Sequence, residues 1–233
     1  MTHRRIIMAR RFFITGTDTD AGKTFCACVL MRRLKEAGLK VRPYKPVVAG
    51  FENGRNADLE SHIRASGLDL RPEDITTFAY QEAIAPHIAA VHENNPIDFG
   101  SLDRDLAKAE ASDADVVITE GAGGWYLPVS DTVLLPEWPA LKGMEIIIVV
   151  GMKLGCLNHA MMTATLLKKE GFNPVGFIAN TTTPQKMPFY EENLNTLKRI
   201  MPCPFIGEVS YREDGDFMKA HDTLDLSALG FCK

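Results

Sequence analysis

Residues suited to binding a phosphate group lie directly after an apolar run near the N-terminus. The segment Gly16-Thr-Asp-Thr-Asp-Ala-Gly22-Lys23-Thr24 follows Phe12–Ile14 and opens a helical pattern. Backbone N–H groups of such a turn point at an anion, Lys23 can reach the outer phosphates, and the Thr24 hydroxyl can coordinate magnesium. Five residues separate the two glycines, where the standard pattern has four. A glycine-rich turn alone explains neither Lys23 nor Thr24, so the segment predicts a nucleotide-binding P-loop.

Three charged residues elsewhere could act on the bound phosphates. Lys45 follows Val41–Tyr44, and a second cation near the terminal phosphate would stabilise the charge that develops during phosphoryl transfer. Glu120 follows Val116–Thr119, at the end of an expected strand, where nucleotide hydrolases place a metal-facing carboxylate. Asp58 is a further candidate carboxylate, although it could simply cap a short helix. Ordinary solvated charges are the alternative interpretation of Lys45 and Glu120.

Strands and helices must alternate along the chain to bring these residues together. Apolar runs rich in Val, Ile and Phe predict strands buried on both faces, and helical patterns separate them. The order predicts an α/β domain with a doubly wound, mostly parallel sheet and helices on both faces. With the P-loop, this is a nucleotide-binding fold, and ligands of such sheets lie beyond the carboxyl ends of the strands. Strands are expected at Phe12–Ile14, Val116–Ile118, Ile146–Val150 and Val175–Ile178, and helices at Lys23–Ala37, Leu102–Ala111, Leu157–Glu170 and Tyr190–Met201.

The chain contains no segment typical of an interdomain linker and no internal repeat, which favours one domain over residues 1–233. The basic residues 1–10 are expected to form a frayed N-terminus. The segment from Gly50 to Asn95 reads as irregular, with a short helix near Ala57–Ala65, and is expected to cover the site.

Composition narrows the class of protein further. Hydrophobic residues make up 45% of the chain and charged residues 24%, which excludes a mostly disordered, collagen-like or coiled-coil protein. The net charge of −4 lacks the basic surplus of a general nucleic-acid binder, so the expected partner is a small molecule. The apolar runs are too short for a signal peptide or a membrane span, and the five cysteines lack zinc-site spacing. A cytoplasmic protein with reduced thiols is predicted.

Five segments together resemble the signature segments of the dethiobiotin synthetase family. They occur in order between about residue 11 and about residue 211, and the longer P-loop is a feature of that family. The segments are Gly16–Thr24, Tyr44-Lys-Pro-Val-Val-Ala-Gly50, Glu120-Gly-Ala-Gly-Gly-Trp125, Val150-Gly-Met-Lys-Leu-Gly-Cys-Leu-Asn-His159 and Ala179-Asn180.

The resemblance implies an ATP- and magnesium-dependent ligase of biotin biosynthesis. In this family 7,8-diaminopelargonic acid, CO2 and ATP give dethiobiotin, ADP and phosphate through a carbamate and a carbamic-phosphoric anhydride. Lys23 and Lys45 would be the catalytic residues, and Thr24, Asp58 and Glu120 would hold Mg2+. The implied ATP-binding residues are Asp20, Ala21, Gly22, Lys23, Thr24, Phe25, Asp58, Glu120, Gly121, Ala122, Gly123, Asn180 and Thr181.

The resemblance also implies that the working unit is a homodimer. In the family the carboxylate tail of the diamine lies at the dimer interface, so a partner chain would complete each site. Asn180 would form a hydrogen bond with adenine, with help from residues 208–214. The implied substrate-binding residues are Thr19, Lys45, Ala49, Leu154, Gly155, Asn158 and Tyr190.

One residue departs from the family pattern. The usual sequence Lys-Pro-Val-Ala-Ser-Gly becomes Lys45-Pro-Val-Val-Ala49-Gly50, so a hydroxyl that contacts substrate is missing. This difference leaves open a related amide-forming synthetase. A regulatory or partition-type P-loop ATPase is a second alternative, but such proteins usually carry a second lysine early in the loop, and Thr17-Asp18-Thr19 supplies none.

Overall fold

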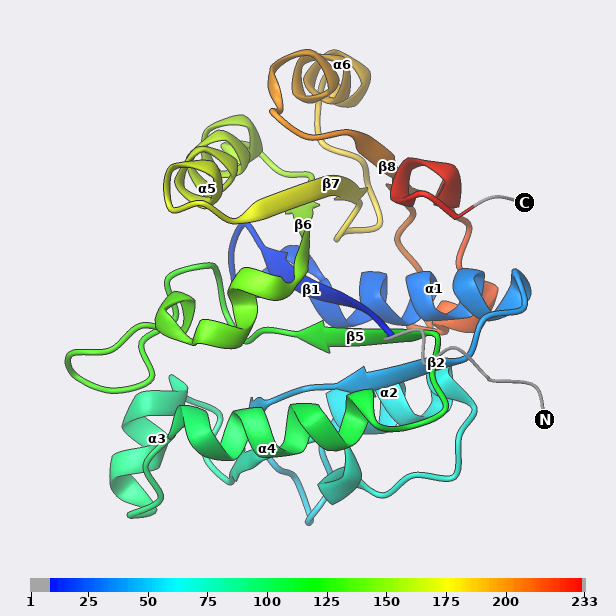
Figure 1. The fold of residues 1–233 in the computed structure, drawn as a ribbon. Coiled ribbons are helices and arrows are strands. Elements are labelled where there is room, and N and C mark those ends of the chain that lie inside the picture. Colours follow the sequence, from blue (N-terminus) through cyan, green and yellow to red (C-terminus); the bar gives the residue numbers. More distant parts are fainter. Residues whose placement is uncertain (1–8, 232–233) are drawn as a thin grey trace.

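The computed structural model describes residues 9–231, which form a parallel sheet flanked by helices (Figure 1). The sheet has the order β2-β5-β1-β6-β7-β8, and a separate small sheet pairs β3 with β4 in parallel. The predicted fold class is confirmed. The strands are β1 (Arg10–Gly16), β2 (Val41–Tyr44), β3 (Val47–Ala49), β4 (Phe78–Tyr80), β5 (Val116–Glu120), β6 (Glu145–Gly151), β7 (Asn173–Asn180) and β8 (Phe205–Val209). The helices are α1 (Lys23–Glu36), α2 (Ala57–Ser66), α3 (Pro86–His92), α4 (Phe99–Glu110), α5 (Cys156–Lys169) and α6 (Tyr190–Ile200).

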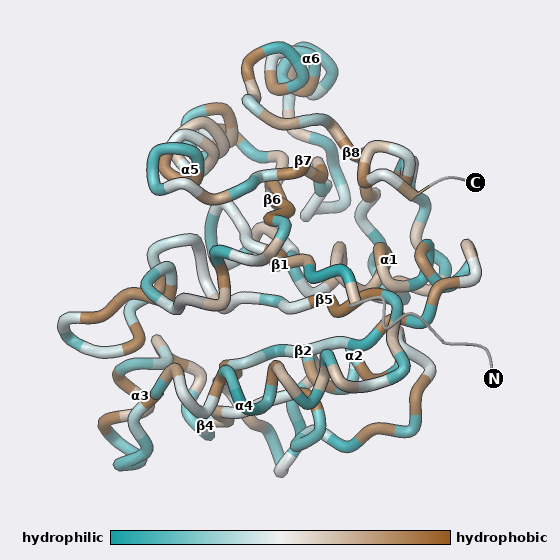
Figure 2. The backbone as a smooth tube through the Cα atoms, in the orientation of Figure 1, coloured by the Kyte–Doolittle hydropathy of each residue, from teal (hydrophilic) through white to brown (hydrophobic). Residues whose placement is uncertain are grey.

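Successive residues of the central strands supply two separate cores, one on each face of the sheet. On β1, Phe13 packs into the core formed with α4, α5 and α6, whereas Phe12 and Ile14 pack into the core formed with α1. This division follows from the two-residue period of a strand. Figure 2 shows apolar residues along β6 and β7, between helices of mixed hydropathy. Both faces of the sheet are therefore covered, as a parallel sheet requires.

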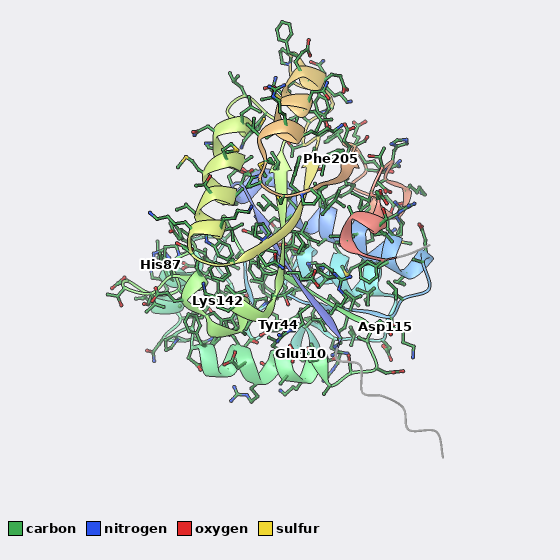
Figure 3. All side chains as sticks on the ribbon, turned by 45° about the horizontal axis from the view of Figure 1, so that its top comes forward. Tyr44, His87, Glu110, Asp115, Lys142 and Phe205 are labelled. Carbon is green, nitrogen blue, oxygen red and sulfur yellow. The ribbon has the colours of Figure 1, made fainter. Side chains whose placement is uncertain are left out.

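Helix α4 is fixed to the edge of the sheet by Tyr44, the last residue of β2. The Tyr44 hydroxyl contacts Thr77 Oγ1 at 2.7 Å and donates to the Leu102 carbonyl at 3.1 Å. Figure 3 shows the labelled Tyr44 among the packed side chains near α4. On the opposite face, α2 packs against α1 and contacts β2. Residues that follow β2 are therefore placed close to α2.

Two sequence-based expectations about the backbone are wrong. Arg10 is ordered rather than frayed, because it begins β1 and its guanidinium donates to Glu145 at 2.7 Å and to the Leu229 carbonyl at 2.6 Å; residues 1–8 lie outside the described part. The segment from residue 50 to 95 is regular over much of its length. It contains the expected short helix, observed as α2, and also β4 and α3. The strands β3 and β4 are only three residues each, too short for a clear pattern in sequence.

Two further observations concern the thiols and the membrane. The four cysteines that the structure describes are buried and free. Within residues 9–231, no helix is both long enough and apolar enough to cross a membrane.

Candidate active site

A cavity of about 870 Å3 lies at the carboxyl ends of the strands. It lies where β1 separates β5 from β6, the point at which the strand order reverses and ligands of such sheets bind. The volume is within the usual range for a small-molecule site. Its walls contain most of the residues that were predicted from the sequence to bind ATP, magnesium or substrate. They are Thr19, Asp20, Gly22, Lys23, Thr24, Phe25, Lys45, Ala49, Asp58, Glu120, Gly121, Ala122, Gly123, Asn180 and Thr181.

The predicted P-loop connects β1 to α1. Gly22 has φ +80°, and a Cβ at this position would lie 2.1 Å from Asn180 Nδ2, so only glycine fits. Asn180 Nδ2 donates to the Ala21 carbonyl at 2.9 Å, which joins the end of β7 to the loop. Ala21 itself is buried and does not line the cavity. Its carbonyl helps to fix the loop that surrounds the start of α1.

Lys23 is folded onto its own loop. Its Nζ donates to the carbonyls of Asp18 at 3.1 Å and Thr19 at 3.2 Å, and the residue is buried. Burial lowers the pKa of Lys23, and the opposing attraction of Glu120 does not restore it. The ammonium therefore lies beside the N-terminus of α1, where backbone N–H groups have no acceptor within the helix. An anion here would meet both kinds of donor.

A buried cluster joins the other chemical groups. Lys45 Nζ lies 2.7 Å from Glu120 Oε1 and 2.8 Å from Asp58 Oδ2, and Thr24 Oγ1 donates to Glu120 Oε1 at 2.8 Å. The sheet explains this convergence, since β5 lies between β2 and β1, and Glu120 pairs in register with Ile14. The ends of these strands therefore present their side chains to one another.

The charges in this cluster stabilise one another. Lys45 and Glu120 are buried, while the Asp58 side chain is 43% exposed. Burial would raise the pKa of Glu120, but Lys45 and His62 hold it well below its usual range. Burial would likewise lower the pKa of Lys45, yet Glu120 and Asp58 raise it. An ionised carboxylate and a full ammonium therefore coexist in the cavity wall, which excludes the solvated-charge interpretation of Lys45 and Glu120.

Asp58 does not cap its helix, which was the alternative role that the sequence left open. The side chain of Asn56 accepts from the N–H groups of Asp58 at 3.1 Å and Leu59 at 3.2 Å, so Asn56 is the cap of α2. The Asp58 carboxylate is instead directed to Lys45. Its contribution to the site is thus an independent negative charge at the cavity.

Comparison with known proteins decides the family. The family model described as an AAA domain matches residues 10–219. The ATP-dependent dethiobiotin synthetase BioD of Pseudescherichia vulneris is 39% identical over 228 residues, which cover 96% of this chain and 94% of that protein. The protein of the same name from Vibrio vulnificus strain YJ016 is 40% identical and covers 94% of this chain and 100% of its own length. The chain belongs to the dethiobiotin synthetase family.

A solved structure shows the same fold more distantly. The ParA family ATPase of Chlorobium tepidum TLS superposes with a TM-score of 0.55 at 18% identity, covering 89% of this chain and 86% of that one. A sequence identity of 18% is evidence for a shared fold only. The dethiobiotin synthetase family is therefore assigned from the sequence relatives, and the ATPase confirms the shared parallel sheet.

The residues expected to hold the tail of the substrate lie outside the cavity of this synthetase-family chain. Leu154, Gly155 and Asn158 are exposed at the start of α5, and Leu154 is 93% exposed. Tyr190 is buried, and its hydroxyl donates to Glu208 Oε1 at 2.9 Å. Tyr190 is also hydrogen-bonded to Thr181, a residue of the cavity wall, whereas Leu154, Gly155 and Asn158 do not line the cavity. The substrate-binding role of all four residues stays a prediction.

The donor set fits the magnesium ion that the dethiobiotin synthetase family implies. Within residues 9–231, no group of three or more His, Cys, Asp or Glu residues could hold a metal. The three candidates are instead the carboxylates of Asp58 and Glu120, which both contact Lys45 Nζ, and the Thr24 hydroxyl, which contacts Glu120. Hard oxygen donors supplied by one or two carboxylates, with nucleotide phosphates completing the shell, are typical of Mg2+ sites.

Several residues around the site are absent from the sequence-based set. His62 contacts Glu120 Oε2 at 2.6 Å, and the one available signal was its place four residues after Asp58, on the same face of a helix. The other missed residues form walls of the cavity, and apolar loop residues give no chemical signal in sequence. They are Val47, Val48, Ala83, Ile84, Ala85, Pro86, Leu127 and Thr182. Tyr211 and Arg212 also line the cavity, and they belong to the segment 208–214 that the resemblance implies near adenine.

Proposed function

We propose that this chain is an ATP-dependent dethiobiotin synthetase that closes a ureido ring on 7,8-diaminopelargonic acid with CO2. The observation that supports the proposal is that the P-loop lysine, Lys23, and a second buried lysine, Lys45, line the same cavity in a chain of this family. Nucleotide binding alone requires Lys23 but not Lys45. A buried cation beside the phosphate site suits a reaction in which a second anion must approach ATP.

Two anions must meet in the first stage of the reaction. One amine of the diamine combines with CO2 and loses a proton to give a carbamate. A carbamate oxygen then attacks the γ-phosphorus of ATP, with ADP leaving, and forms a carbamic-phosphoric anhydride. Lys23 lies in the cavity wall at the start of α1, where the phosphates are expected, and Glu120 and Asp58 fix the Lys45 ammonium in the same wall. Their positive charges would offset the repulsion between carbamate and triphosphate.

The second stage needs positioning more than further chemistry. The neighbouring amine attacks the carbonyl carbon of the anhydride and expels phosphate, which closes the ring. Because both groups belong to one substrate molecule, orientation in the cavity supplies much of the rate. The wall that includes Val47, Val48 and Leu127 would pack against the aliphatic part of the diamine and keep water from the anhydride.

The magnesium ion, when bound, would neutralise charge on the transferring phosphoryl group. Thr24, Asp58 and Glu120 would hold it, and two observations support this: all three offer oxygen ligands, and Glu120 contacts Thr24 directly and is joined to Asp58 through Lys45. Asn180, whose amide is fixed by the Ala21 carbonyl, would retain its side-chain oxygen for the 6-amino group of adenine.

The proposal includes a homodimer that completes the substrate site, in the cytoplasm. Large apolar side chains are exposed on and before α5 and α6: Leu154 before α5 at 93%, Met162 in the middle of α5 at 56%, and Phe189 before α6 at 75%. An exposed apolar set of this kind is suited to burial against a partner. A second chain seated here would bring Leu154, Gly155 and Asn158 toward the site of its partner.

The test is phosphate release by purified protein given ATP, magnesium and bicarbonate, with and without 7,8-diaminopelargonic acid. The proposal predicts that release depends on the diamine and equals the dethiobiotin formed. Equal ATP hydrolysis without the diamine would instead indicate a regulatory or partition-type ATPase. Release that requires another amine or carboxylate would indicate a related amide-forming synthetase.

A further inference from the structure

Glu120 has a second buried partner in addition to Lys45. His62 Nε2 lies 2.6 Å from Glu120 Oε2, and neither side chain is exposed to solvent. His62 belongs to α2, one helical turn after Asp58, so a single helix presents two groups toward the ends of β2 and β5. Asp58 lines the cavity, whereas His62 lies behind its wall.

These contacts divide the two oxygens of Glu120 between two tasks. Oε1 accepts from Thr24 and Lys45, the cavity-lining residues, and Oε2 faces His62. The terminal torsion of a glutamate is intrinsically broad, so an unrestrained carboxylate would sample other orientations. A donor on Oε2 removes that freedom and keeps Oε1 directed at the cavity.

The hydrogen-bonding state of the imidazole follows from the same geometry. A glutamate carboxylate accepts hydrogen bonds, so His62 Nε2, 2.6 Å from Oε2, is placed as the donor. His62 Nδ1 is buried and has no hydrogen-bond partner. The ring's hydrogen bonding is therefore confined to Glu120, unlike that of a histidine which ties several elements together.

We propose that His62 is a positioning residue for Glu120, which keeps its Oε1 oriented to ligate a divalent cation beside the nucleotide phosphates. The inference rests on the magnesium site in the proposed function. It goes beyond that site by assigning part of the cation affinity to a residue that touches neither the cation nor the nucleotide. Loss of a hydrogen-bonded partner behind a metal ligand typically weakens metal binding about 10- to 100-fold.

The experiment measures Mn2+ binding to the protein–ADP complex from the electron paramagnetic resonance signal of free Mn2+, with no diamine present. Mn2+ shares the carboxylate preference of Mg2+. His62→Leu removes the donor at similar volume and should raise the Mn2+ dissociation constant about tenfold or more. ADP affinity without metal should change less than about twofold, because the P-loop contacts remain intact.

Two variants, His62→Gln and His62→Asn, distinguish a positioning role of His62 from a role in packing alone. The side-chain nitrogen of His62→Gln can occupy the place of Nε2, so this variant should keep Mn2+ affinity within about threefold of the original protein. The side chain of His62→Asn is too short to reach Glu120 and should behave like His62→Leu. This pair decides the question even if His62→Leu does not fold. Ser66→Ala is the matched control, because Ser66 is a buried polar residue one turn further along α2 whose hydroxyl bonds Ile63 in the helix and Leu68 just after it, and not Glu120.

Glu120→Gln distinguishes failure of this inference from failure of the proposed function. If Glu120→Gln loses Mn2+ affinity while His62→Leu and His62→Asn keep it within about twofold, the positioning role is refuted and the cation site stands. If Glu120→Gln itself keeps full Mn2+ affinity, the assigned cation site and the role of His62 both fall.

Discussion

Replacement of Lys45 by glutamine removes the second cation from the cavity while keeping a hydrogen-bond donor on a side chain one bond shorter. Lys45 Nζ lies 2.7 Å from the fully buried Glu120 and 2.8 Å from the half-exposed Asp58, so the variant leaves a buried carboxylate with less compensation. Breaking a buried ion pair costs about 3–5 kcal/mol. Because Glu120 still accepts from Thr24 and His62, we expect the lower limit, about 3 kcal/mol.

This loss has two measurable consequences. For a domain of this size, about 3 kcal/mol lowers Tm by about 6–12 °C, which a thermal melt can follow. Turnover should fall about 10²- to 10³-fold, the usual effect of removing one charge-stabilising donor from a transition state. ADP affinity should change less than about threefold, since Lys23 and the start of α1 are untouched.

Lys40→Gln is the matched control for this variant. Lys40 immediately precedes β2, the strand that Lys45 follows, and its exposed ammonium pairs with Asp113. The same change of charge at this surface position should cost less than about 1 kcal/mol and leave turnover intact. If Lys45→Gln turns over within about threefold of the original protein, the role assigned to Lys45 is wrong.

Three further changes test other parts of the site. Gly22→Ala should abolish nucleotide binding, because its Cβ would lie 2.1 Å from Asn180 Nδ2. The control Gly38→Ala, at φ +85° with nothing within 4 Å of the added Cβ, should lower the free energy of unfolding by only about 1–2 kcal/mol and keep nucleotide binding. Equal affinities of the two variants in a nucleotide titration would contradict this. Ala49→Ser adds a hydroxyl to the cavity wall and should lower the apparent KM for the diamine about 2- to 12-fold, which is equivalent to about 0.5–1.5 kcal/mol. An unchanged KM would show that the hydroxyl is dispensable. The lowered pKa of Lys23 means that the native state loses this proton before the unfolded chain does, so the share of stability due to Lys23 rises with pH until about 10.5. Urea unfolding at pH 8 and pH 10 should show this increment in the original protein and not in Lys23→Met, and identical pH dependence of the two would refute it.

The fold could be predicted because its signals are local and repeated. The five-residue apolar run Ile146–Val150 cannot belong to a half-exposed strand, and glycine after the periodic stretches marked the ends of α1 and α5. The strands β3 and β4 were not predicted, because a strand of three residues is too short to show the two-residue alternation of a strand. Their stability comes from pairing with each other and from Val48, which packs with Leu59 and Ile75.

The site could be predicted to the extent that chemistry requires particular residue types at strand ends. Lys45 and Glu120 lie at the ends of two strands, and Lys23 begins the helix that follows a third strand. The parallel sheet brings the ends of these three strands together. His62 could not be assigned, because its partner is 58 positions away and a lone histidine on a helix is usually structural. Likewise, one chain shows Leu154 exposed but not what contacts it.

The most direct test of the central claim is to follow the carbon of 13C-bicarbonate into product. Purified protein with magnesium, ATP, 13C-bicarbonate and 7,8-diaminopelargonic acid should yield dethiobiotin with the label in its ureido carbonyl, in equal amount to the phosphate released. The label is read by mass spectrometry and 13C NMR, and its rate of appearance should fall about 10²- to 10³-fold when Lys45→Gln replaces the original protein. Phosphate release without a labelled cyclic urea would contradict the account.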